Sequence, residues 1–147
     1  MHNGDSSESH YLTPCITGSL TKLSMRILIA DDDRGVLNAL KLLLTASGHE
    51  VLTAENRSQA LNIIGILVEQ SQPLSVLVTE VRIWNMKGLE IVRSVRRLIP
   101  DLSVIFMTGS PNDHIYQEIC KLENCGYMEK PFHYITLSQV ISAKAVP

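Results

Sequence analysis

The chain has 147 residues, and its 13 basic and 15 acidic residues give a net charge of −2. This length suits one domain with a hydrophobic core and is short for two. A near-neutral charge gives no electrostatic case for direct nucleic-acid binding, and no apolar run approaches the ~20 residues that a membrane span needs.

The start of the chain differs in composition from the rest. Residues 1–24 are rich in small polar residues and contain no basic region followed by an apolar stretch, which predicts a flexible tail without a secretory signal. The domain is expected over residues 25–147. Cys15, Cys120 and Cys125 are odd in number and form no CxxC pair, so we interpret them as free thiols of the cytoplasm.

The first two strand–helix units follow this tail. Continuous apolar residues at 27–30 predict a strand buried on both faces. Apolar residues at helical spacing over 36–44 predict a helix, with Asp33 as its N-cap. A strand at 51–54 and a helix over 60–68 form the second unit.

Three further strand–helix units complete the pattern. In each of them a short apolar run is followed by apolar residues at helical spacing. Their strand and helix ranges are 74–79 with 89–99, 102–108 with 110–122, and 126–129 with 137–141. Five alternating units predict a flavodoxin-like α/β fold. In this three-layer α/β/α arrangement, a five-stranded parallel sheet has the strand order 2-1-3-4-5.

Polar residues stand where the predicted strands end. Asp31 and Asp32 follow the first strand, Glu80 the third, Thr108 ends the fourth and Lys130 follows the fifth. Neighbouring carboxylates repel one another unless a cation lies among them, and hard oxygen ligands in an open crevice suit Mg²⁺. The lysine and the threonine hydroxyl could hold a phosphoryl oxygen or a carboxylate.

Four motifs in this order are similar to the receiver domain of two-component response regulators, over about residues 25–145. The motifs lie at residues 27–33, 78–90, 104–109 and 126–132. The resemblance implies that the chain is a signalling protein and not an enzyme. The partners it implies are a sensor histidine kinase or another signalling protein, with a homodimer as a further expectation.

The resemblance also implies a role for each matching residue. Asp31 and Asp32 match the acidic pair that holds Mg²⁺, and the backbone carbonyl of Arg82 matches the third protein ligand. Thr108 matches the switch hydroxyl. Among the other matches, Lys130 corresponds to the lysine that contacts the phosphoryl group, in a Lys-Pro bond that is usually cis, and Tyr127 corresponds to the aromatic switch on the output face.

The chain departs from the family pattern at Glu80, which stands in place of the phosphorylated aspartate and is the fourth expected metal ligand. Its extra methylene moves the carboxylate by about one carbon–carbon bond, and phosphoryl transfer depends on positions right to well under an ångström. We therefore expect poor or absent phosphorylation. Glu80 could reach Lys130 or Thr108 and partly imitate the phosphorylated form, or simply neutralise the lysine in a silent protein-binding module.

The following loop departs from the family as well. Trp84 replaces the usual proline and Lys87 the usual aspartate. Trp84 could be an exposed interaction anchor or could fold over the crevice. The chain ends about sixteen residues after Lys130, so we expect output through protein contacts near Tyr127, unless the chain is a piece of a longer regulator.

A haloacid-dehalogenase-like phosphatase is the alternative function. Asp31, Asp33 and Gly35 after an apolar strand resemble the nucleophile motif of that family. The same family needs an acidic motif after its lysine, and residues 132–147 contain neither Asp nor Glu. The catalytic metal would then lack ligands, which makes this the weaker hypothesis.

Overall fold

The fold is described from a computed structural model, which defines residues 24–109, 117–119 and 121–144. Five parallel strands form one sheet in the order β2-β1-β3-β4-β5. The strands are β1 (Arg26–Ala30), β2 (Glu50–Ala54), β3 (Val76–Glu80), β4 (Ser103–Thr108) and β5 (Cys125–Glu129). The predicted strand order is confirmed.

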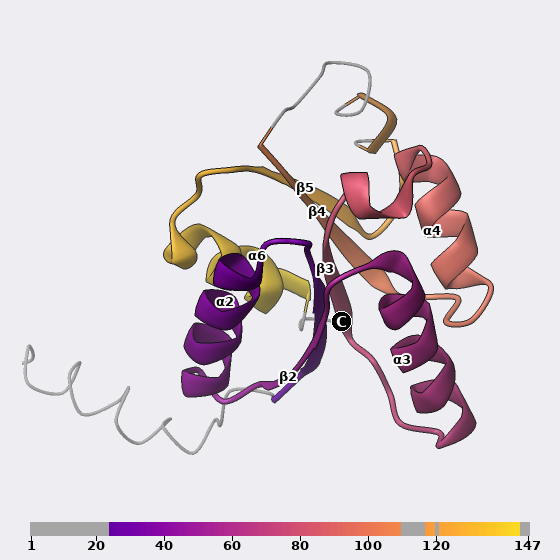
Figure 1. Ribbon diagram of the computed structural model, residues 1–147, viewed down its shortest axis with the longest axis horizontal. Coiled ribbons are helices and arrows are strands. Elements are labelled where there is room, and N and C mark those ends of the chain that lie inside the picture. The colour runs from indigo at the N-terminus through magenta and orange to yellow at the C-terminus, as the bar shows by residue number, and fades with distance from the viewer. Residues whose placement is uncertain (1–23, 110–116, 120, 145–147) are drawn as a thin grey trace, which may run out of the picture.

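Helices cover both faces of this sheet, as Figure 1 shows, with α2 and α6 on one side and α3 and α4 on the other. The helices are α2 (Arg34–Ala46), α3 (Arg57–Glu69), α4 (Gly88–Arg96) and α6 (Tyr134–Lys144), with a 3₁₀ turn, η2 (Arg82–Trp84). Of the helix expected over 110–122, residues 110–116 and 120 lie outside the described part of the chain, as does nearly all of the predicted tail.

Two apolar clusters, one on each face of the sheet, form the core. On one face β1 and β3 contribute Ile27, Ile29, Val76 and Val78, which pack under α2 and α6. On the other face α3, α4 and Trp84 of η2 pack on the sheet. Burial on both faces explains why the strands are continuously apolar rather than alternating. Among the described residues, no helix is long and apolar enough to cross a membrane.

Local signals place the helix ends. Asp33 caps α2 by accepting hydrogen bonds from the amides of Gly35 and Val36, as predicted. The third strand is shifted from the predicted 74–79 to Val76–Glu80, so Glu80 is its last residue rather than the first residue of a loop. This shift holds the glutamate backbone in the sheet, which fixes the direction of its side chain.

Candidate functional site

The register of the sheet brings the predicted acidic residues together. Ala30, the last residue of β1, pairs with Thr79 of β3, so Asp31 directly after β1 comes next to Glu80 at the end of β3. Both side chains are fully buried, with 0% of their surface exposed. Asp32 is exposed beside them. Two buried carboxylates on adjacent strands are costly unless positive charge neutralises them.

Lys130 supplies the first positive charge. Its Nζ donates to Asp31 Oδ2 at 2.5 Å and lies 3.1 Å from Glu80 Oε2. The contact with Glu80 is an ion pair without the alignment of a hydrogen bond. The peptide bond between Lys130 and Pro131 is cis, as the sequence predicts. Lys130 therefore joins the ends of β1 and β3 to the segment after β5.

Arg82 supplies the second positive charge, which sequence reasoning missed. Its Nε donates to Glu80 Oε1 at 3.2 Å, while 66% of the Arg82 side chain stays exposed. The predicted role of Arg82 used only its backbone carbonyl, which accepts a hydrogen bond from Asn85 N at 3.3 Å. An arginine two residues after a strand-end glutamate is the signal that could have predicted this pair.

The pKa values reflect these contacts. Burial alone would lower the pKa of Lys130, but the contacts with Asp31 and Glu80 outweigh it and raise the pKa above 10.5. The hydrogen bond to Glu80, and then the charge of Glu80, raise the pKa of Arg82. Both cations are therefore held in their charged forms. Burial is also the main reason that the pKa of Tyr127 is raised.

Trp84 fixes the loop that carries Arg82. The indole is fully buried, and its Nε1 donates to Thr79 Oγ1 at 2.8 Å. Trp84 packs in the cluster beneath α3 and α4. Both alternatives raised from the sequence, an exposed anchor and a cover over the crevice, are wrong. The physical reason is that a tryptophan in the η2 turn buries a large apolar surface under the loop.

The other predicted residues lie around the same edge of the sheet. Thr108 is the last residue of β4 and is buried, and its carbonyl accepts a hydrogen bond from Lys130 N at 2.8 Å. Tyr127 is half-buried on β5 and packs against the α3–α4 cluster. The structure thus gathers Asp31, Glu80 and Lys130 in one crevice, with Thr108 beside them.

The carboxylates as they stand do not fit a resident Mg²⁺. No group of three His, Cys, Asp or Glu side chains is arranged to hold a metal in the part of the chain that the structure describes. Asp31 Oδ1 accepts from Asp33 N and Oδ2 from Lys130, while Arg82 holds Glu80 Oε1. A divalent ion bound at ~2 Å would need oxygen atoms that these contacts use.

The geometry of the described residues gives no support to the phosphatase alternative. Asp33, the second acid of that motif, uses Oδ1 to cap α2 at the amides of Gly35 and Val36. Asp31, the expected nucleophile, is buried against Lys130. Each acid therefore has a structural partner within the chain.

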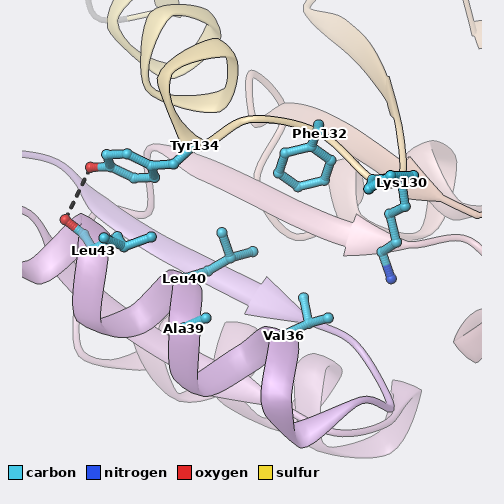
Figure 2. A pocket seen from close by; sticks show the side chains of 8 residues that line it. Val36, Ala39, Leu40, Leu43, Lys130, Phe132 and Tyr134 are labelled. Atoms are coloured by element: carbon cyan, nitrogen blue, oxygen red, sulfur yellow. Dashed lines mark hydrogen bonds between the residues drawn. The ribbon is translucent and has the colours of Figure 1, made fainter.

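An apolar groove adjoins the crevice. It has a volume of about 520 Å³ and lies between α2 and the segment from Lys130 to Tyr134. Figure 2 shows Leu40 and Leu43 of α2 facing Phe132 and Tyr134 across it. Tyr134 Oη donates to the Leu43 carbonyl at 3.0 Å, which ties α6 to α2 at one end. Lys130 therefore belongs to both the ionic crevice and the groove wall.

Comparisons with known proteins agree on one family. A family model described as the response regulator receiver domain matches residues 27–142. The chain is 29% identical over 108 residues to the response regulator receiver protein CpdR of Brucella abortus, covering 74% of this chain and 86% of that protein. It is 31% identical over 112 residues to the response regulator MprA of Mycobacterium bovis.

That second match covers 75% of this chain but 46% of MprA, so the chain spans about half the length of that relative. Among solved structures, a response regulator receiver domain protein from Clostridium thermocellum superposes with a TM-score of 0.68 at 29% identity. The superposition covers 82% of this chain and 93% of that one. The similarity therefore extends over the whole sheet and its helices.

Proposed function

Because the chain belongs to the response regulator receiver domain family, we propose that it is a signalling module that works without phosphorylation at Glu80. The observation that carries this proposal is the contact between Glu80 Oε2 and Lys130 Nζ, 3.1 Å apart. The lysine expected to hold a phosphoryl group already has two carboxylate partners. Asp31, Glu80 and Lys130 are thus already paired with one another within the protein.

The charge of this cluster also supports the proposal. A phosphoryl group brings about two negative charges and three acceptor oxygens, whereas Glu80 brings one charge and two oxygens. Glu80 satisfies Lys130 only in part, and Asp31 supplies the other contact. The expected switch roles of Thr108 and Tyr127 remain predictions for this chain, since they depend on a change of state.

Receiver domains are generally signalling modules rather than catalysts and typically bind Mg²⁺. For this chain, we propose no enzymatic activity. A magnesium site formed by Asp31, Asp32, Glu80 and the Arg82 carbonyl remains a prediction, and the crevice described above does not favour it.

The module is proposed to act through contact with another signalling protein, such as a sensor histidine kinase, in the cytoplasm. The apolar groove supports this, because an amphipathic helix can lay its apolar face into such a groove. On α2, Leu43 lines the groove and is 38% exposed, so part of this apolar surface faces solvent. Self-association into a homodimer remains a further expectation, which sedimentation of the full chain would measure.

Shortening the glutamate should restore phosphorylation. We expect the Glu80→Asp variant to gain a phosphoryl group from a small acyl-phosphate donor with Mg²⁺, while the parent gains none. The aspartate carboxylate would withdraw by about one carbon–carbon bond and leave room for in-line transfer. Intact-protein mass spectrometry measures the gain directly. Glu69→Asp, which makes the same change at an exposed position on α3, is the matched control.

Phosphate on the parent at Glu80 would contradict the proposed function. Equal phosphate on the control and on Glu80→Asp would contradict it as well, because the gain would then not depend on shortening Glu80. Mapping the modified peptide separates these outcomes.

A further inference from the structure

The crevice contains two buried carboxylates and two cations. Asp31 and Glu80 are fully buried, and Lys130 and Arg82 each contact at least one of them. Their formal charges cancel without any bound ion. Because unpaired buried charges cost several kcal/mol each, a balanced cluster needs no metal to be stable.

Arg82 stands on the solvent side of Glu80. The Glu80 carboxylate is entirely buried, whereas two thirds of the Arg82 side chain is exposed, so Arg82 joins this carboxylate to a solvent-exposed positive charge. Asp32, the exposed acid of the pair after β1, contributes to raising the pKa of Arg82 and so lies within electrostatic reach. Arg82 thus meets the charges that a divalent ion would meet.

The backbone around Arg82 holds it in this place. Arg82 begins the η2 turn, which ends at the buried Trp84. Asn85 closes the turn in the left-handed region, with φ 53°, and its N–H donates to the Arg82 carbonyl. The turn thus holds the Arg82 guanidinium against Glu80, and the Arg82 carbonyl already accepts a hydrogen bond from Asn85.

We propose that Arg82 is a built-in cation that competes with divalent metals for the carboxylates beside it and so weakens their binding. The Arg82–Glu80 pair and a bound Mg²⁺ or Mn²⁺ compete for the same carboxylate, so each weakens the other by the same factor. This inference deepens the proposed function and rests on it. It assigns the loss of metal binding to a particular side chain, in addition to the changed phosphoacceptor.

The test is a Mn²⁺ titration of the full chain, with the free ion followed by its electron paramagnetic resonance signal and with Mg²⁺ as competitor. We expect Arg82→Gln to bind Mn²⁺ about fivefold more tightly than the parent, the factor that one exposed ion pair can contribute. Arg97→Gln removes the same charge at the exposed far end of α4 and should match the parent. Circular dichroism confirms that each variant is folded.

Location is tested by a second substitution. Adding Asp32→Asn to Arg82→Gln should return the Mn²⁺ affinity to the parent value, because the more tightly bound ion would need the Asp32 carboxylate as a ligand. Equal Mn²⁺ affinity of the parent and Arg82→Gln would overturn the proposal, and so would a gain that survives Asp32→Asn. These titrations contain no phosphodonor, so their failure is distinct from phosphorylation of the parent, which would contradict the proposed function.

Discussion

Replacing Trp84 with alanine is expected to lower the free energy of unfolding by about 3–5 kcal/mol, the usual cost of removing a buried tryptophan. Trp84 is fully buried among residues of α3 and α4, so the variant leaves a large cavity. It also removes the indole donor to Thr79 Oγ1. Urea unfolding followed by circular dichroism measures the loss, since the chain has no other tryptophan.

Two further variants separate packing from hydrogen bonding. Trp84→Phe keeps much of the apolar volume but loses the N–H donor. Its free energy of unfolding should therefore fall less than that of Trp84→Ala, and the lost hydrogen bond should account for about 1–3 kcal/mol of the decrease. Ile135→Ala, at a position that is 66% exposed on α6, is the control and should change little. If Trp84→Ala lowers the free energy of unfolding no more than Ile135→Ala does, the stability of the turn does not depend on the buried indole.

Replacing Lys130 with methionine is expected to cost about 3 kcal/mol at neutral pH. Methionine keeps much of the length of the side chain but leaves Asp31 and Glu80 buried at neighbouring strand ends with one fewer cation. Removing one partner of a buried pair typically costs about 3–5 kcal/mol, and the lower end applies because Lys130 is 20% exposed. Lys41→Met, at an exposed position on α2, is the control for chemical denaturation.

The difference in stability between the parent and Lys130→Met should depend on pH. The folded-state pKa of Lys130 is raised, so the parent has the full stabilisation below about 10.5 and loses it as pH rises through the raised value. Lys130→Met lacks that loss. A variant as stable as the parent near pH 7 would mean that the ion pairs contribute nothing.

Most of the fold could be predicted from the sequence because its signals are repeated and local. Apolar runs gave the five strands, and alternation with helical spacing gave a parallel sheet. Sheet order then predicted that Asp31 lies beside Glu80, whereas the place of Lys130 at the same site followed from the family resemblance. Element boundaries were less certain, since an apolar run does not show which of its residues make ladder hydrogen bonds.

The irregular loop after β3 could not be predicted in the same way. Hydrophobic periodicity applies to regular elements, so it does not show which side of a 3₁₀ turn faces the core. Trp84 therefore had two plausible positions, and neither is the one observed. Arg82 was assigned through its backbone because the family pattern concerns that atom, whereas its guanidinium binds a glutamate that the family pattern lacks.

Lys130 has a place in two environments at once. Its ammonium group contacts Asp31 in the ionic crevice, and the same residue also lines the apolar groove beside Phe132. A protein that binds in the groove would therefore contact Lys130, the residue that neutralises the charges of Asp31 and Glu80. By thermodynamic reciprocity, whatever stabilises or loosens those ion pairs would change the affinity of that protein, and its binding would act back on them. A receiver that works without phosphorylation, as we propose, would in this way still respond to contact with a partner protein.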